Sequence, residues 1–376
     1  MSVRACDVWR HEEACERRQR VVIAVVSLAG LISVLAAGGQ VVSPVGAAIA
    51  NHEPSRSGSF VALTYNVAGL PEPFSGSEPD INTPLISPKL NGYDVVLVQE
   101  DWIDPVPPIP GVNFHHDDLI SAVTHPYLSE PAPPPLGSDP RRPTAIVADG
   151  LNYLSRLPFG VVYRQMWPGC FGGADTSDGG AADCLSQKGF SVTRLQVADG
   201  VEIDLYNLHG EAGSTPEDVH WSAQDYLVLA EFINTYSVGQ AIILGGDTNL
   251  STSSEPDATV WATFLASTGL RDVCSVVDCG ADEHVIDKFA FRSGSVVGVN
   301  PLTHRFERDV FVRSDGQPLS DHDALAVRFE WTAPGVGDMP PNTAVPFPTT
   351  TLPSGSTTSS VLPLAGPVAA TPRFTG

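Results

Sequence analysis

The chain has 376 residues, and its 21 Lys plus Arg against 43 Asp plus Glu give a formal net charge of −22. Hydrophobic residues make up 42% and charged residues 17% of the chain, a composition that excludes a wholly disordered polyelectrolyte. The acidic balance opposes a broad interface with nucleic acid or anionic lipid, because tight binding to a phosphate backbone needs clustered Lys and Arg.

Residues 1–50 have the layout of a secretory signal peptide. A basic cluster at 17–20 precedes the apolar run 21–37, and residues 48–50 (AIA) offer a small-residue cleavage site. Because residues 21–42 approach the ~20 apolar residues that span a bilayer, an uncleaved anchor is the alternative. We therefore expect a secreted or extracytoplasmic protein, and retention on a membrane by residues 21–42 stays open.

The segment from residue 58 to residue 331 predicts one folded domain with many strands and few helices. Short apolar runs predict strands at 60–65, 93–98, 151–154, 189–197, 201–208, 240–244, 284–291, 308–313 and 324–329. Helical periodicity is found at 220–235 and 256–267. This balance favours sheets packed face to face with helices outside. The segment 332–376 is rich in Pro, Thr and Ser and predicts a disordered tail.

The six cysteines fall into three groups: Cys6 with Cys15, Cys170 with Cys184, and Cys274 with Cys279. Close pairs in an exported domain predict two local disulfides, Cys170 with Cys184 and Cys274 with Cys279, and buried free thiols are the alternative. The segment between Cys170 and Cys184 carries Asp and Gly but lacks EF-hand spacing, so we interpret it as a disulfide-closed loop. The Pro-rich insertion 102–143 is interpreted as a surface loop that packs its own aromatic residues, with a lip over membrane or substrate as the alternative.

Polar side chains occur where the predicted strands begin or end. They are Asn66, Glu100, His209, Asp247 with Asn249, and Asp321 with His322. Each residue alone has an ordinary explanation as a turn former, a helix cap, a solvated loop or a core histidine. Their repetition at successive strand ends instead predicts one shared rim of the sheets.

Oxygen and imidazole groups gathered on one rim suit the hydrolysis of a phosphate ester. A hard cation such as Mg²⁺ prefers carboxylate and carboxamide oxygens, so Glu100 with Asn66 suits it. The metal polarises the ester while a neutral histidine deprotonates water. An imidazole base also needs an orienting acceptor, for which Asp287 and Asp321 are both candidates.

The motifs around these residues resemble those of the endonuclease/exonuclease/phosphatase superfamily, which includes deoxyribonuclease-I-like nucleases, inositol phosphatases and neutral sphingomyelinases. The matching segments are LTYNVAGLP (63–71), VQED (98–101), DGLNYLSRLP (149–158), NLHGEAG (207–213), LGGDTN (244–249), IDKFAFR (286–292) and LSDHDAL (319–325). The resemblance implies an α/β (α+β) fold, a four-layered sandwich of two mixed β-sheets flanked by helices. Lys288 and the Gly210-Glu211 pair depart from the family's usual pattern.

The resemblance also implies a metal site. Glu100 is the expected principal ligand, with Asn66 beside it and Asp321 reaching the same ion. The expected cofactor is Mg²⁺, with Mn²⁺ or another divalent cation as alternatives.

Five further residues receive catalytic roles from the resemblance. His322 would be the general base, oriented by Asp287, and His209 would donate to the phosphoryl group or the leaving oxygen. Asp247 would position the attacking water, and Asn249 would hold a phosphate oxygen.

The substrate class is less well determined than the reaction. The NLHGEAG and VAGLP segments look closer to the secreted sphingomyelinase-like branch than to DNA-repair nucleases. The chain has only three Lys, and Arg141-Arg142 is the sole adjacent basic pair after residue 50, so no basic stripe for a polyanion is evident. We expect a monomeric Mg²⁺-dependent phosphodiesterase acting on a phospholipid headgroup, with peripheral membrane contact left open. A secreted nuclease acting on nucleic acid and an inert secreted binding protein are the alternatives.

Overall fold

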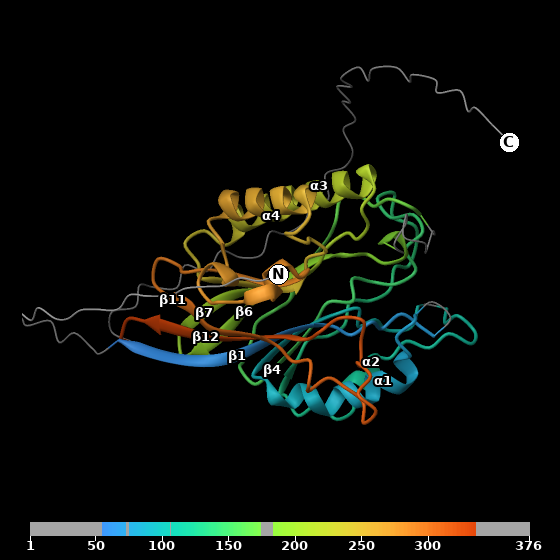
Figure 1. The fold of residues 1–376 in the computed structure, drawn as a ribbon, viewed down its shortest axis with the longest axis horizontal. Coiled ribbons are helices and arrows are strands. Elements are labelled where there is room, and N and C mark those ends of the chain that lie inside the picture. Colours follow the sequence, from blue (N-terminus) through green and yellow to red (C-terminus); the bar gives the residue numbers. More distant parts are fainter. Residues whose placement is uncertain (1–54, 73–74, 106, 174–182, 336–376) are drawn as a thin grey trace, which may run out of the picture. The chain divides into compact units, whose positions relative to one another are not determined.

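The computed structural model describes residues 55–72, 75–105, 107–173 and 183–335. They form four layers in which two six-stranded sheets lie face to face and helices cover both outer faces (Figure 1). The expected fold class, a sandwich of two mixed sheets flanked by helices, is confirmed.

The first sheet has the strand order β11-β12-β1-β2-β4-β3. Its strands are β1 (Arg56–Asn66), β2 (Val95–Gln99), β3 (Tyr127–Leu128), β4 (Asn152–Ser155), β11 (Gly298–Phe306) and β12 (Leu325–Ala333). β1 runs parallel to β2 and antiparallel to β12, so the sheet is mixed. The helices α1 (Pro79–Ile86) and α2 (His116–Ile120) cover its outer face (Figure 1).

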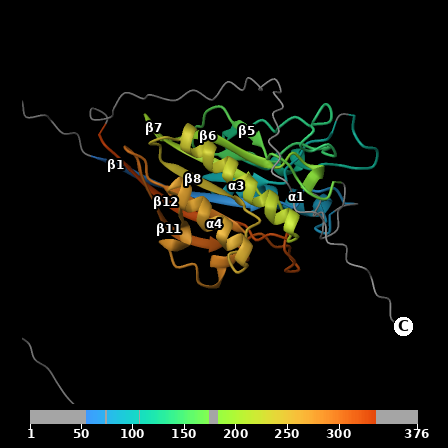
Figure 2. The same ribbon diagram turned by 90° about the horizontal axis from the view of Figure 1, so that it is seen from above.

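The second sheet has the strand order β5-β6-β7-β8-β10-β9. Its strands are β5 (Tyr163–Met166), β6 (Gly189–Ala198), β7 (Val201–His209), β8 (Ile242–Asp247), β9 (Arg271–Asp272) and β10 (Asp287–Arg292). β7 and β8 are parallel, and the other pairs are antiparallel. The helices α3 (Pro216–Tyr236) and α4 (Glu255–Thr268) lie side by side across its outer face (Figure 2).

Helix α3 begins where the sequence provides both halves of a capping box. The Thr215 hydroxyl accepts from the backbone N–H of Asp218 at 3.3 Å, and the Asp218 carboxylate accepts from the backbone N–H of Thr215 at 2.9 Å. Pro216 occupies the first helical position, where no intrahelical N–H bond is lost. The helix predicted at 220–235 therefore starts four residues earlier.

The region after residue 297 differs from the expectation. The strand predicted at 308–313 is a turn, in which the carbonyl of Glu307 accepts from the N–H groups of Val310 and Phe311. The strand is instead β11, which the sequence pattern missed because Pro301 argues against a strand. β11 tolerates this proline because it lies at the sheet edge, and its register shifts between Pro301 and Thr303.

Both predicted disulfides are present, linking Cys170 to Cys184 and Cys274 to Cys279. The first of these predictions concerns a loop whose residues 174–182 are outside the described part of the chain. The predicted signal segment 1–50 and residues 336–376 of the predicted tail also lie outside it, whereas β12 extends to Ala333. Within the described ranges, no helix has the length and apolar character needed to cross a membrane.

Candidate functional site

Side-chain alternation along the strands directs the predicted site residues into the space between the two sheets. In β8, Ile243 packs into the core between the sheets, whereas Ile242 and Leu244 pack against the outer helices. Because successive side chains point to opposite faces, Asp247 continues the row of Ile243. The same two-residue period places Asn66 on the face of β1 that carries Ala62, a residue of the inter-sheet core.

Strand register in the second sheet brings three of the predicted residues into one row. His209 at the end of β7 pairs with Asp247 at the end of the parallel strand β8. Asp287, the first residue of β10, pairs with Asp247 from the other side. All three side chains are buried, and the Nε2 atom of His209 lies 3.4 Å from Oδ2 of Asp247.

Asn66 connects this row to the first sheet. It ends β1, and Glu100 directly follows the neighbouring parallel strand β2. The Asn66 amide Nδ2 donates to Oε1 of Glu100 and to Oδ2 of Asp247, each at 3.0 Å. Its Oδ1 accepts from the backbone N–H of Ala68 at 3.0 Å, which fixes the orientation of the amide.

His322 joins the group from the loop that precedes β12. Its Nδ1 lies 2.8 Å from Oδ2 of Asp287, and its Nε2 lies 3.6 Å from Oδ2 of Asp247. The hydroxyl of Ser320 accepts from the backbone N–H of His322 at 3.1 Å and donates to the carbonyl of Asn66 at 2.8 Å. With Nδ1 donating to Asp287, the Nε2 lone pair faces the centre of the cluster.

Two predicted residues lie at the margin of this group. Asp321 is exposed, and its Oδ1 lies 3.3 Å from the Ser320 hydroxyl oxygen. Asn249 donates its backbone N–H to Oδ1 of Asp247 and its Nδ2 to the carbonyl of Gly210, both at 3.0 Å. The Asn249 amide is therefore engaged with the loop that follows β7.

Burial and the charges of neighbouring groups have opposing effects on the pKa values of the carboxylates and histidines in this cluster. Burial raises the pKa of Glu100 and lowers that of His209 well below its ordinary value, so the His209 imidazole is neutral at pH 7. Burial alone would raise the pKa of Asp247 and lower that of His322. The attraction between these two groups reverses both shifts, and Asp287 further raises the pKa of His322.

The oxygen donors fit a hard divalent cation. Glu100 and Asp247 gather around one Asn66 amide, and Asp287 adds a third carboxylate within the same cluster. Oxygen atoms of Asp247 and Asp287 and a ring nitrogen of His322 lie within 4.8 Å of one another. Such a concentration of partly or fully buried negative charge is costly unless a cation balances it.

Backbone conformations around the site are strained. Ala68, Glu100 and Asn249 are non-glycine residues with φ of 51°, 60° and 50°. Left-handed conformations of non-glycine residues are uncommon and cluster at functional sites. Gly69 is required nearby, since a Cβ atom there would lie 2.1 Å from the carbonyl oxygen of Glu100.

We expect Gly69→Ala to destabilise the fold by about 1–3 kcal/mol, because the methyl group must displace the backbone of Glu100. The midpoint of chemical denaturation measures this effect. Gly76→Ala is the matched control, since a Cβ atom at Gly76 meets nothing within 4 Å. Equal stability of the two variants would contradict the close approach.

Lys188 and Trp167 support the site, although no motif pointed to them. Lys188 is buried, pairs with Asp183 and donates to the carbonyl of Gly210 at 3.2 Å. The indole N–H of Trp167 donates to the carbonyl of His209 at 2.8 Å. A hint for Lys188 was available, because a lysine directly before the apolar strand β6 is unusual in a chain with three lysines.

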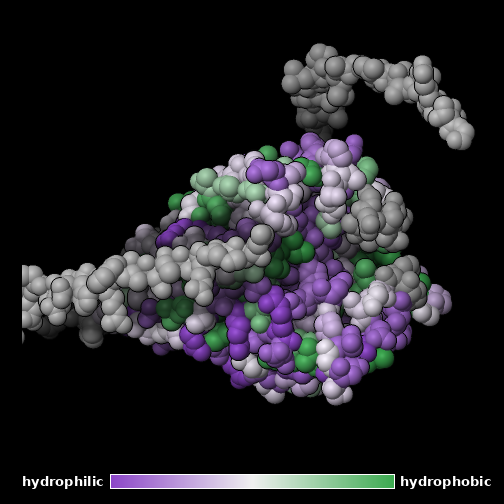
Figure 3. Space-filling view, viewed as in Figure 1, coloured by the Kyte–Doolittle hydropathy of each residue, from purple (hydrophilic) through white to green (hydrophobic). Residues whose placement is uncertain are grey.

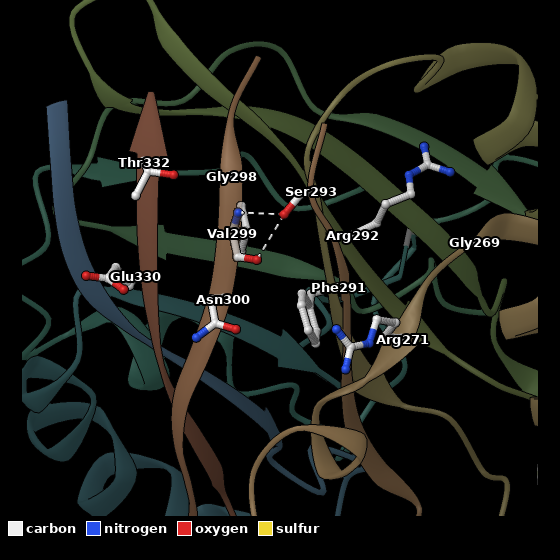
Figure 4. A pocket seen from close by; sticks show the side chains of 10 residues that line it. All are labelled: Gly269, Arg271, Phe291, Arg292, Ser293, Gly298, Val299, Asn300, Glu330 and Thr332. Carbon is white, nitrogen blue, oxygen red and sulfur yellow. Dashed lines mark hydrogen bonds between the residues drawn. The ribbon is translucent and has the colours of Figure 1, made fainter. Parts of the chain in front are cut away.

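A pocket of about 440 Å³ lies elsewhere, at the end of β10 opposite Asp287. Its lining residues are Gly269, Arg271, Phe291, Arg292, Ser293, Gly298, Val299, Asn300, Glu330 and Thr332 (Figure 4). The guanidinium of Arg271 lies 5.5 Å from the centre of the Phe291 ring, and Ser293 is hydrogen-bonded to the backbone of Val299 (Figure 4). None of the predicted site residues lines this pocket.

Comparison with known proteins gives a sequence match over most of the chain. Curated sphingomyelinases of Mycobacterium tuberculosis and Mycobacterium bovis are each 32% identical over 299 residues, which cover 74% of this chain and 54% of each relative. The chain is homologous to these sphingomyelinases. It spans about half the length of the curated relatives that it matches. This similarity agrees with the sphingomyelinase-like resemblance inferred from the motifs, and no family model matches the chain.

Solved structures with a similar backbone path include three bacterial proteins. Sphingomyelinase C from Streptomyces griseocarneus is 17% identical, with a TM-score of 0.48 over 72% of this chain and 99% of that chain. A Staphylococcus aureus beta toxin with bound magnesium ions is 14% identical, with a TM-score of 0.49 over 72% and 99%. An endonuclease/exonuclease/phosphatase protein from Beutenbergia cavernae is 15% identical, with a TM-score of 0.49 over 72% and 71%.

Proposed function

We propose that this chain is a secreted, Mg²⁺-dependent phosphodiesterase that hydrolyses sphingomyelin or a related phospholipid. The observation that carries the proposal is the junction of both sheets at Asn66, whose amide contacts Glu100 and Asp247 beside two imidazoles. The sequence similarity to curated sphingomyelinases supports the substrate class.

His322 is proposed as the general base. Asp287 accepts from its Nδ1 and holds the ring so that Nε2 points toward the cluster. Nε2 can take a proton from an attacking water only when the ring is neutral, a form that a bound cation would favour because its charge opposes the carboxylates that raise the pKa of His322. Asp247, whose Oδ2 lies 3.6 Å from Nε2, is proposed to position that water.

His209 is proposed to act on the phosphoryl group or the leaving oxygen. Its Nε2 lies 3.4 Å from Asp247, and its low pKa keeps the ring neutral, so we propose that it donates a hydrogen bond through an N–H group without giving up a proton. Asn249 is proposed to hold a phosphate oxygen. Because its Nδ2 is bound to Gly210 in this structure, that role requires the amide to exchange its partner on substrate binding.

Glu100 and Asn66 are proposed as ligands of the divalent cation, with Asp321 contributing from the rim. The proposed ion is Mg²⁺, with Mn²⁺ or another divalent cation as alternatives. When bound, the cation supplies charge that screens the phosphate and polarises the ester. The Asn66 amide must then turn so that Oδ1 faces the ion, which breaks its bond from the Ala68 N–H, because in this structure Nδ2 faces both carboxylates.

An extracytoplasmic location is supported by the two disulfides, which form and persist in oxidising compartments. We propose residues 1–50 as the export segment and the residues after β12, which ends at Ala333, as a tail outside the catalytic domain. Contact with a membrane, if the substrate is a phospholipid, is proposed to be peripheral. The described residues on the face in Figure 3 are mainly hydrophilic, with hydrophobic residues in small separate groups.

The deciding experiment is hydrolysis of two substrates by the 376-residue chain under identical metal conditions. Release of phosphocholine from sphingomyelin vesicles, abolished by EDTA and by His322→Ala, is the expected result. Cleavage of plasmid DNA without release of phosphocholine from the vesicles would favour a nuclease instead. Inactivity on both substrates would point to inositol phosphates as the substrate class or to an inert binding protein.

A further inference from the structure

A fully buried arginine lies behind the loop that carries His209 and has no part in the proposed chemistry. The Arg142 side chain is 0% exposed, and its guanidinium forms an ion pair with the buried carboxylate of Glu211. Its other contacts are backbone carbonyl oxygens, namely Asp183 at 2.8 Å, Ser186 at 3.1 Å and Gly169 at 2.9 Å. Asp225 on α3 and Asp183 are further buried carboxyl groups near Arg142, and burial raises the pKa of Asp225 well above its ordinary value.

Arg142 was counted in the sequence as half of a basic pair, but the two arginines have opposite environments. The Arg141 side chain is 46% exposed and pairs with Asp139 on the surface. Arg142 is enclosed and points into the domain. Only Arg141 of the pair is therefore accessible from solvent, and Arg142 contacts groups inside the domain.

Glu211 stands two residues after His209, in a loop with little freedom to move. The carbonyl of His209 accepts from the indole of Trp167, and the backbone N–H of Gly210 donates to the carbonyl of Asp247 at 2.8 Å. A Cβ atom at Gly210 would lie 2.4 Å from the Thr248 carbonyl, so the loop passes close to the segment after β8. One closely held residue, Gly210, therefore separates Glu211 from His209.

The remaining contacts of Arg142 connect this loop to the first disulfide. Gly169 and Asp183 are the direct neighbours of Cys170 and Cys184, which are bonded to each other. Arg142 thus binds both ends of the disulfide-closed loop and the loop after β7 at the same time. One planar guanidinium with several N–H donors can do this, whereas a lysine ammonium cannot reproduce the fork.

Stability alone does not account for this buried pair. Replacement of a buried ion pair by apolar residues of similar volume is often neutral or stabilising, because both charges must be desolvated. Loss of one partner alone is costly, since it leaves an unpaired buried charge. The geometry that the pair imposes on the loop therefore explains its presence better than stability does.

We propose that Arg142, through Glu211, is a positioning residue that sets the place of His209 in the catalytic site. The inference rests on the proposed function, because it assigns a purpose to the placement of His209 in phosphoester hydrolysis. It adds to that function a contribution from the Pro-rich insertion 102–143, which supplies Arg142.

The test is Arg142→Lys in two backgrounds, the natural chain and His209→Ala. In the natural background, kcat should fall about 10–100-fold while KM changes little, as expected for a group that supports a catalytic side chain. In the His209→Ala background, Arg142→Lys should change kcat less than about twofold, because the group that it positions is gone. Glu211→Gln serves as the second variant, should Arg142→Lys fail to fold.

Arg141→Lys is the matched control and should keep the natural kcat, since Arg141 is on the surface. Near-ultraviolet circular dichroism checks that each variant is folded. An equal loss of kcat in both backgrounds would show a general structural role and overturn the inference, as would an unchanged kcat in the natural background. Failure of the natural chain to hydrolyse any phosphoester would instead overturn the proposed function, and the inference with it.

Discussion

His322→Ala should lower turnover by roughly 10²–10⁴ while the chain stays folded. The His322 imidazole contacts the orienting carboxylate of Asp287 through Nδ1 and points Nε2 toward Asp247. Its removal deletes the proton acceptor but leaves the strands that form the rim unchanged. Initial rates at saturating metal and substrate measure the effect, with circular dichroism to confirm the fold.

His220→Ala is the matched control for this variant. His220 is an exposed histidine on α3, and its ring contacts the neighbouring Trp221. Its replacement should leave turnover within about twofold, as surface substitutions usually do. Comparable rates for the natural chain and His322→Ala would refute the assignment of the base.

The pH dependence of turnover follows from the same group. The carboxylates Asp247 and Asp287 raise the pKa of His322, although burial opposes this shift. A base acts only when unprotonated, so activity should be lost as the pH falls through the pKa of His322. Added divalent cation brings positive charge and should move this acidic limb to lower pH. The limb should be missing in His322→Ala.

The convergence of the site could be predicted because it depends on local patterns. Each predicted residue stands next to an apolar run, and the two-residue side-chain period decides which face it shares. These local rules are sufficient to predict the positions of Asn66, Asp247 and Asp287. The structure places all three side chains between the sheets. Asp321 was also named by its motif, yet it lies at the rim because the turn before β12 exposes it.

The support behind the site could not be predicted, because it depends on contacts between distant segments. Arg142 and Glu211 are 69 positions apart, and no spacing rule connects them. Nothing in the sequence distinguishes buried Arg142 from exposed Arg141. The edge strand β11 was missed for a related reason, since a proline that breaks a central strand is tolerated at a bulged edge.

Glu100→Gln should raise the metal concentration needed for half-maximal activity by roughly 10² or more, because the number of charged ligands tunes the affinity for a divalent cation over orders of magnitude. Glutamine keeps the shape of the side chain. It also keeps an oxygen that can accept from Nδ2 of Asn66, which lies 3.0 Å from Oε1 of Glu100 in the natural chain. The change therefore isolates the negative charge from the packing.

Metal titration of activity and calorimetric titration of the protein with Mg²⁺ should both detect this loss of affinity. The matched control is Glu231→Gln, an exposed glutamate on α3, which should leave both titrations unchanged. If Glu100→Gln binds metal as the natural chain does, Glu100 is not a ligand. The buried carboxylates Asp247 and Asp287, which lie within 4.8 Å of His322, would then be the next groups to test as the metal site.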